Sequence, residues 1–144
     1  MPVSIREASA YDVQILADLA TQLGYPTQPD QMMQRLTTLP SLPSRAFVAV
    51  AEGQVVGFVQ VSVYFPFLMD HAAEIAALVV DEKWRNQGIG HVLLQAAEAW
   101  AVENGCSDLY VRTNIVRERA HAFYQREGFQ LVKTALTFAK TLRQ

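Results

Sequence analysis

The spacing of apolar and polar residues predicts a strand and two helices in the first third of the chain. Apolar residues alternate with polar ones over 3–5, which is typical of a short strand. They then recur at helical spacing from Ser9, a favoured capping residue, to Leu23, and Gly24 stands where such a helix would end. A second helix is predicted over 28–39, and the prolines that follow it end it.

The middle of the chain predicts a hairpin, a buried strand and a long helix. Residues 46–65 are rich in Val, Phe and Tyr and are interrupted by a turn signal at Gly53, as in an antiparallel hairpin. Residues 72–80 form an almost entirely apolar run, which indicates a buried strand. From Gly88 the apolar residues return to helical spacing, and Gly105 stands at the end of that helix.

Shorter signals complete the pattern. A strand is predicted at 109–111, a short helix follows with Phe123 and Tyr124 on its apolar face, and two further strands are predicted at 128–132 and 136–142. The order β-α-α-β-β-β-α-β-α-β-β predicts an α/β fold with a mixed sheet. Because the chain has 144 residues and no linker-like segment, we expect residues 1–144 to form a single domain.

Composition narrows the classes of function. A formal net charge of −2 argues against a nucleic-acid-binding protein. Cys106 is the only cysteine, so the chain offers neither an internal disulfide nor a cysteine cluster for a metal, and we expect no metal site. No secretion signal and no membrane-spanning run is evident, so we expect a cytoplasmic protein that binds no membrane.

The sequence RNQGIG, from Arg85 to Gly90, joins the apolar run to the long helix. A basic turn with glycine at a helix N-terminus offers unpaired backbone N–H groups and the positive end of the helix dipole, which suits a phosphate group. The residues do not match a P-loop, and a leucine occupies the third glycine position of the dinucleotide-binding pattern. They match [RQ]-x-x-G-x-[GA], the pattern of a coenzyme A pyrophosphate loop. The alternative is that the glycines only let the helix begin close to the sheet.

Two motifs resemble those of the GCN5-related N-acetyltransferase family. The stretch LVVDEKWRNQGIGHVLL resembles its acetyl-CoA motif, and RERAHAFYQREGF resembles its second motif, [NR]-x-x-A-x-x-F-Y-x-x-x-G-F. Both stand in the family's order and spacing, with the expected helix pair and hairpin upstream. The resemblance implies the acyl-CoA N-acyltransferase fold, in which a mixed, mainly antiparallel central sheet is flanked by helices.

The resemblance also implies where coenzyme A binds. Backbone N–H groups of the turn would hold the pyrophosphate, and the main chain at the end of the buried strand would pair with pantetheine as a pseudo-strand. The backbone N–H of Leu78 would polarise the thioester carbonyl. The implied residues are Leu78, Val79, Val80, Arg85, Asn86, Gln87, Gly88, Ile89 and Gly90.

Tyr124 and Glu74 are the candidates for proton transfer. Tyr124 matches the family's tyrosine at the coenzyme, which protonates the departing thiolate, and a phenol with an ordinary pKa of about 10 stays protonated at neutral pH. The alternative is a core aromatic beside Phe123. Glu74 stands at the spacing of the glutamate used as base in the histone-acetyltransferase branch, and burial in the apolar run would raise its pKa. Strand parity predicts that it shares a face with Leu78, and the alternative is a paired or edge glutamate.

The second motif departs from the family pattern at its first position. That position is often an asparagine that contacts pantetheine, and here it is Arg117. Asn114, three residues earlier, is the candidate substitute, unless it only caps the helix. Arg117 or Arg119 is a candidate to reach a coenzyme phosphate, and the alternative is that both are solvated charges.

Three other side chains are assigned structural roles. For His71 we expect a local pair with Asp70, and for His121 packing or surface exposure within the second motif. Cys106 opens the strand after the long helix, so we expect buried packing and not a covalent acetyl intermediate.

The sequence therefore predicts an acetyl-CoA-dependent N-acetyltransferase that moves the acetyl group directly to a primary amine of a small molecule or peptide. The acceptor is expected to bind where 23–43 meets the loop 64–71, because loops carry specificity on such scaffolds. The alternatives are a non-catalytic acyl-CoA-binding sensor of the same fold and transfer of a longer acyl group. An exposed C-terminal strand would allow a homodimer.

Overall fold

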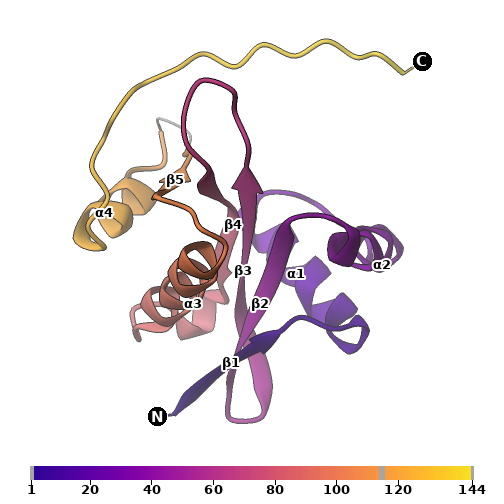
Figure 1. Cartoon of the computed structure of the whole chain (residues 1–144). Helices are drawn as coiled ribbons and strands as arrows, with labels where there is room; N and C mark the ends of the chain where they lie inside the picture. The colour runs from indigo at the N-terminus through magenta and orange to yellow at the C-terminus, as the bar shows by residue number, and fades with distance from the viewer. Residues whose placement is uncertain (1, 114–115, 144) are drawn as a thin grey trace. The chain divides into compact units, whose positions relative to one another are not determined.

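The computed structural model describes residues 2–113 and 116–143. Their contacts divide the chain into two compact units, Met1–Arg112 and Thr113–Gln144, and each unit is described by itself. The first unit contains the sheet and most of the helices, whereas the second contains one helix and the C-terminal segment (Figure 1).

A five-stranded sheet organises the first unit (Figure 1). Its strands lie side by side in chain order and are β1 (Val3–Glu7), β2 (Ser44–Ala51), β3 (Gln54–Tyr64), β4 (Ala72–Val80) and β5 (Asp108–Val111). Neighbouring strands are antiparallel except β4 and β5, which are parallel. The mixed, mainly antiparallel sheet expected from the sequence is therefore confirmed.

Helices cover both faces of the sheet (Figure 1). On one face lie α1 (Val13–Leu23) and α2 (Pro29–Thr38), with the short 3-10 turns η1 (Ala10–Asp12) and η2 (Leu39–Ser41) beside them. On the other face lies α3 (Ile89–Glu103), which follows the 3-10 turn η3 (Glu82–Trp84). Gly24 ends α1 with a φ of 105°, in agreement with the stop signal in the sequence.

Each face of the sheet carries an apolar layer. The layer under α1 joins two helix residues to three strand residues, and its members are Leu16, Leu19, Val48, Phe58 and Val79. The layer under α3 is formed by the helix residues Ile89, Leu93, Leu94, Ala97 and Ala101, all of them buried. The helical spacing of both sets explains why the sequence pattern predicted these helices.

Gly57 allows β3 to approach β4 and α3 closely. A Cβ atom at this position would lie 2.8 Å from the carbonyl oxygen of Val79 and 3.1 Å from Cδ1 of Leu93. Because real Cβ atoms do not approach backbone oxygen so closely, any side chain here would force the strands or the helix apart.

An ion pair joins β1 to the start of the first helix. Arg6 donates to both carboxylate oxygens of Asp12 at 2.8 and 2.9 Å, and the backbone N–H of Ser9 donates to the same carboxylate at 2.8 Å. The Asp12 side chain is only 5% exposed. The hydrogen bonds from Arg6, supported by Ser9, lower the pKa of Asp12 below its ordinary value.

The second unit contains α4 (Glu118–Arg126) and an extended C-terminal segment, drawn in yellow in Figure 1. Residues 129–143 carry no helix or strand, so the strands predicted at 128–132 and 136–142 are wrong. A strand needs a neighbour for its backbone hydrogen bonds, and an alternating apolar pattern does not supply one. Beyond Phe129, which is half-buried, the large apolar side chains of this segment are 73–88% exposed.

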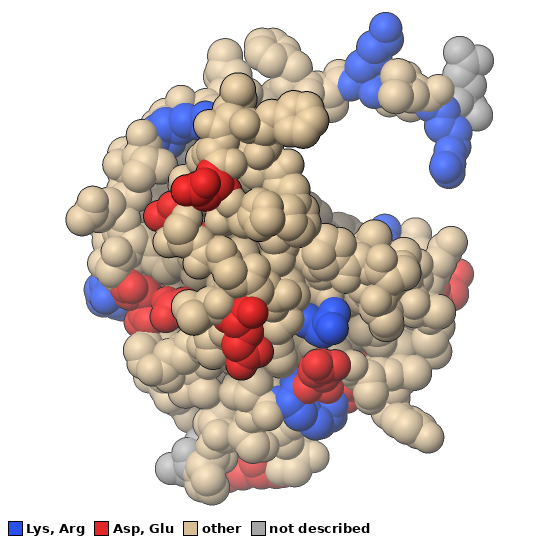
Figure 2. Space-filling model, in the orientation of Figure 1, with Lys and Arg blue, Asp and Glu red and all other residues tan. Residues whose placement is uncertain are grey.

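The charged surface is mixed. On the face shown in Figure 2, acidic and basic side chains stand in small groups separated by uncharged surface. This distribution agrees with the formal net charge of −2. Within the part of the chain that the structure describes, no helix is both long enough and apolar enough to cross a membrane.

Candidate active site

The turn predicted to hold a phosphate lies between β4 and α3. At its start the side chain of Asp81 accepts a backbone hydrogen bond at 2.9 Å. Arg85 points back toward the strand, where its Nε donates to the carbonyl oxygen of Val80 at 3.2 Å. Asn86 and Gly88 have positive φ angles of 63° and 81°. Together these features fold the turn back against the end of β4.

The N-terminus of α3 completes this turn. Gly88 is the N-cap residue, and the N–H of Val92 donates to the carbonyl oxygen of Gly88 at 3.2 Å. The N–H groups of Ile89 and Gly90 precede that bond and cannot join the helical ladder. A Cβ at Gly88 would meet no heavy atom within 4 Å, so the surface over this glycine is open to a ligand. Open space, N–H donors and the positive end of the dipole fit the pyrophosphate of coenzyme A.

A side chain from α1 holds the same turn. The Nε2 of Gln22 donates to the carboxylate of Asp81 at 3.2 Å, and its Oε1 accepts from the N–H of Glu82 at 3.1 Å. These bonds connect the turn to a helix about 60 residues earlier in the chain. Sequence reasoning missed Gln22, because it belongs to no motif and its partners are known only from the fold.

The strand β4 is paired along its whole length on one side only. It pairs with β3 from Ala72 to Val80, but with β5 only from Ala72 to Ile75. Among the described residues, Ala76–Val80 therefore has an edge that no strand covers. This open edge leads toward the turn at 85–90. Within it the Val79 side chain is buried in the core, whereas Leu78 and Val80 are half-buried.

A β-bulge interrupts β4 at Ala76. On β3 the residues Gln60 and Val61 are consecutive, and they lie opposite Ala77 and Ile75 of β4. Ala76 is thus an extra residue without a partner of its own, which is the definition of a bulge. Bulges change which face the following side chains occupy.

The bulge places Glu74 and Leu78 on opposite faces of the sheet. Residues directly opposite each other on paired strands point to the same face, and Glu74 lies opposite Ser62 whereas Leu78 lies opposite Val59. Ser62 and Val59 are three residues apart on β3, so their side chains point to opposite faces. The prediction that Glu74 and Leu78 share a face is wrong, because strict alternation does not hold across a bulge.

Glu74 is paired and partly exposed. Its side chain is 29% exposed, and its Oε2 lies 3.7 Å from Nη2 of Arg112, the residue that follows β5. Tyr110 stands beside it in the parallel register. The expected burial among apolar side chains is therefore wrong, because the neighbours on this face are polar. The carboxylate is accessible on the α1 face of the sheet.

Polar side chains continue from Glu74 across β3 to β2. The Oγ atoms of Ser62 and Ser44 are 2.8 Å apart, and Nε2 of Gln60 donates to Oγ of Ser44 at 3.2 Å. Ser44 is buried, so this small network fixes the orientation of the hydroxyl groups opposite Glu74. Sequence reasoning missed these three residues, because only the register between strands brings them together.

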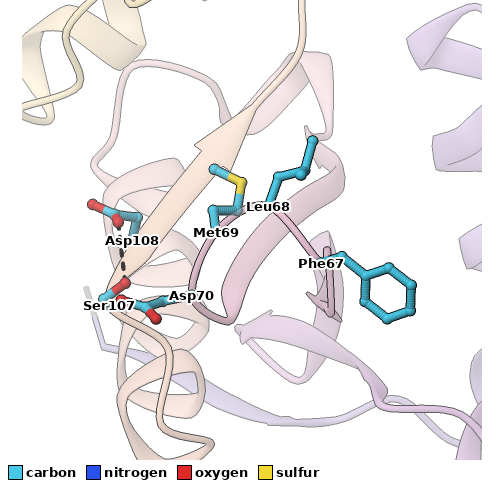
Figure 3. A pocket seen from close by; sticks show the side chains of 6 residues that line it. All are labelled: Phe67, Leu68, Met69, Asp70, Ser107 and Asp108. Atoms are coloured by element: carbon cyan, nitrogen blue, oxygen red, sulfur yellow. Dashed lines mark hydrogen bonds between the residues drawn. The ribbon is translucent and has the colours of Figure 1, made fainter.

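The end of the region 23–43 contacts β3 just before the loop 64–71. The N–H of Val63 donates to the carbonyl oxygen of Pro43 at 2.8 Å. The loop after β3 exposes apolar side chains and borders a cavity of about 480 Å³. Its lining, drawn in Figure 3, consists of Phe67, Leu68, Met69, Asp70, Ser107 and Asp108. In that view the ring of Phe67 points away from the acidic side chains, which gather near the start of β5.

Tyr124 lies on α4 within a group of aromatic rings. Its ring makes edge contacts with Phe123 and Phe129, at centroid distances of 5.1 and 5.4 Å. Burial raises the pKa of Tyr124 to about 12, so the phenol remains protonated at neutral pH. Arg117 is exposed at the N-cap of α4, and Asn114 lies outside the described residues.

The two histidines and the cysteine singled out in the sequence are partly covered by neighbouring residues. The ring of His71 packs edge-on against Phe65 at 4.5 Å between centroids, a contact that the sequence did not predict. His121 is half-buried on α4. Cys106 is half-buried, and burial raises the pKa of its thiol, which disfavours the nucleophilic thiolate.

Comparison with known proteins adds independent information. Residues 13–129 match the acetyltransferase (GNAT) family model. The chain is 27% identical over 145 residues to aminoglycoside N(6')-acetyltransferase type 1 of Stenotrophomonas maltophilia, covering 96% of this chain and 94% of that protein. It is 39% identical over 98 residues to aminoalkylphosphonate N-acetyltransferase of Salmonella typhimurium, covering 66% of this chain and 61% of that protein.

Solved structures agree on the fold. The crystal structure of an aminoglycoside antibiotic 6'-N-acetyltransferase from Acinetobacter baumannii superimposes with a TM-score of 0.87 at 20% identity, covering 99% of this chain and 100% of that one. The family model spans most of the chain, so this protein belongs to the GNAT family and is an acetyl-CoA-dependent acetyltransferase.

Proposed function

We propose that this enzyme transfers the acetyl group of acetyl-CoA directly to a primary amine of a small molecule or peptide. The observation that carries the proposal is the open edge of β4 at Ala76–Val80, which begins two residues from Glu74 and leads to the turn at 85–90. The names of two relatives, an aminoglycoside and an aminoalkylphosphonate N-acetyltransferase, support a small-molecule amine as acceptor.

The donor would lie along this open edge. An extended chain that carries amide groups adds to a free strand edge as another strand does, which suits pantetheine beside Leu78, Val79 and Val80. The N–H groups of the turn would bind the pyrophosphate, as its open surface at Gly88 supports. Arg117 and Asn114 remain candidates for further coenzyme contacts.

In the proposed reaction the amine nitrogen attacks the thioester carbonyl carbon. The N–H of Leu78 donates to the oxyanion that develops, and Glu74 receives the proton of the amine. One N–C bond forms and the C–S bond breaks as Tyr124 gives its proton to the thiolate. Solvent returns a proton to Tyr124 and removes one from Glu74.

The direct test measures thiol release from acetyl-CoA across a panel of primary amines. We expect Glu74→Gln to lower kcat about 100-fold, because an amide cannot accept the proton. The matched control is Glu98→Gln, which removes a carboxylate from the exposed face of α3 and should leave kcat unchanged. An equal kcat for Glu74→Gln and wild type would mean that Glu74 is not the proton acceptor. Tight binding of acetyl-CoA without acetylation of any amine would support the sensor alternative.

Three features of the whole protein belong to the same proposal. Residues 1–144 form a single domain, which is supported by a family model that extends across both units. Two copies associate through the exposed apolar side chains of the C-terminal segment. The enzyme works in the cytoplasm, where acetyl-CoA is its donor.

A further inference from the structure

Arg112 lies beside Glu74 but is held only loosely. Its Nη2 is 3.7 Å from Oε2 of Glu74, and its side chain is 78% exposed. A charge-assisted hydrogen bond between such groups is about 2.7–2.9 Å long, so this contact is longer than a formed hydrogen bond. Exposed ion pairs of this kind contribute only about 0–1 kcal/mol to folding. Folding stability therefore gives little reason for an arginine at this position.

Arg6 shows how a structural arginine is bound in the same chain. It donates to both oxygens of Asp12 at 2.8 and 2.9 Å, and that carboxylate is almost fully buried. The Arg112–Glu74 contact is longer than the Arg6–Asp12 bonds, and the Arg112 side chain is more exposed than that of Arg6. Glu74 also contacts fewer of its partner's N–H donors than Asp12 does. A guanidinium carries five N–H donors in a planar fork, so Arg112 retains donors for a second oxyacid.

We infer that the acceptor carries an anionic oxyacid group close to its amine, and that Arg112 binds this group while Glu74 faces the amine. The inference rests on the proposed function, because it takes Glu74 as the residue that receives the amine proton. The carboxylate of Glu74 and the guanidinium of Arg112 are in loose contact, so one small molecule can reach both. With hydrogen bonds of about 2.8 Å at each end, the amine nitrogen and the anion lie about 4–7 Å apart.

That separation defines the substrate class. An amine and an acid group joined by two carbon atoms fit it, as in β-amino carboxylic acids and short aminophosphonic acids. Carboxylate and phosphonate present the same oxygen geometry to a guanidinium fork, so both belong to the inference. A polycationic acceptor is disfavoured beside Arg112 by like-charge repulsion.

The other groups on this face do not oppose an anion at Arg112. Ser62 and Tyr110 stand next to Glu74 and are uncharged hydrogen-bonding side chains. Asp108 begins β5, four residues before Arg112, and an extended chain at about 3.3 Å per residue separates them by about 13 Å. This exceeds the screening length of about 8 Å at physiological salt, so the acidic end of β5 has little effect on an anion bound by Arg112.

The test compares three acceptors of equal chain length at saturating acetyl-CoA, namely 2-aminoethylphosphonate, β-alanine and ethanolamine. We expect wild-type kcat/KM to be about tenfold or more higher for the two anionic acceptors. Arg112→Ala should lower kcat/KM for these acceptors about 30-fold, through KM, and leave ethanolamine unchanged. Arg112→Lys, which keeps the charge but not the fork, should restore part of the loss.

The control is Arg45→Ala, because Arg45 makes a similarly loose pair, 3.6 Å from Glu7, on another strand. An equal loss for all three acceptors in Arg112→Ala would overturn the inference, since Arg112 would then only position Glu74. Better use of a polycation such as neamine, with no loss for the anionic acceptors, would overturn it as well. A loss confined to the phosphonate or to the carboxylate would support it and identify the acid group.

Failure of the proposed function is a separate outcome, namely no acetylation of any amine by the wild type. In that case calorimetric titration of 2-aminoethylphosphonate into the protein with coenzyme A still tests Arg112. Binding by the wild type that is lost in Arg112→Ala supports the inference. Equal binding by both proteins, or binding by neither, overturns it.

Discussion

At the scale of single residues, surroundings shift proton affinity in opposite directions. Tyr124 is enclosed by aromatic rings, and burial raises its pKa to about 12. Asp12 accepts hydrogen bonds from Arg6 and Ser9, which lower its pKa. The raised pKa keeps the Tyr124 phenol protonated and able to donate, and the lowered pKa keeps the Asp12 carboxylate charged. Neither outcome follows from residue type alone.

Tyr124→Phe should lower kcat about 100-fold, because the thiolate then leaves without a proton donor. A tyrosine donates only below its pKa, and a pKa of about 12 keeps the donor form throughout the working range. The wild-type kcat should therefore show no decline from this group between about pH 8 and pH 10. Steady-state rates over that range, with Tyr11→Phe as an exposed control, test both statements. Full activity of Tyr124→Phe would mean that another acid serves the thiolate.

Gly88→Ala should raise the KM for acetyl-CoA about tenfold, because a methyl group would occupy the open space over the turn. It should also cost about 1 kcal/mol of stability, since φ is 81°. Gly53→Ala is the matched control: its φ is 75°, a Cβ there also meets nothing within 4 Å, and it lies in the β2–β3 hairpin. Both variants should lose similar stability, but only Gly88→Ala should lose donor affinity. Equal KM values for acetyl-CoA in Gly88→Ala and Gly53→Ala would argue against pyrophosphate binding at this turn.

At the scale of elements, local sequence patterns were enough to predict the position of the central strand and of the helix that follows it. The bounds of β4 were predicted correctly as 72–80, and α3 lies within the span predicted between its two glycines, because apolar spacing is a local property. The bulge at Ala76 was not predicted, because a bulge depends on the partner strand. The network around Ser44 and the position of Arg112 beside Glu74 depend on strand register in the same way.

The link between β1 and the first helix predicts acid sensitivity. The pKa of Asp12 in the folded state lies below its unfolded value near 3.8, so its stabilising effect is fully present above that pH and is lost as pH falls through the folded-state value. Asp12→Asn should lower the free energy of unfolding by about 2 kcal/mol at pH 7. The difference from wild type should shrink as the pH falls below about 3.8. Urea unfolding at both pH values measures it, and an unchanged difference would assign the loss to packing.

At the scale of the whole molecule, the second unit lacks the means to fold alone. It extends from Thr113 to Gln144, shorter than the roughly 40 residues below which chains generally need a disulfide, a metal or a partner. Cys106, the only cysteine, lies outside it. The helix α4 has no buried residue. We therefore expect its order to depend on the rest of the protein, as the single-domain proposal requires.

The unfolding of the two units should consequently coincide. In urea, the fluorescence of Trp84 and Trp100 reports on the first unit, and hydrogen exchange of the α4 amides reports on the second. We expect one midpoint for both probes, because the single-domain proposal requires the two units to unfold together. Loss of α4 protection at a clearly lower urea concentration would contradict the single-domain proposal.

Ala76 has a consequence for changes in chain length. Strands inside a sheet generally tolerate no change of length, because their register fixes which side chains face the core. Ala76 is an exception, because it has no partner on β3. Removing it would leave Glu74 opposite Ser62 and Leu78 opposite Val59, so both side chains would keep their faces. The strand β4 can therefore lose this one residue without moving the proposed base to the other side of the sheet.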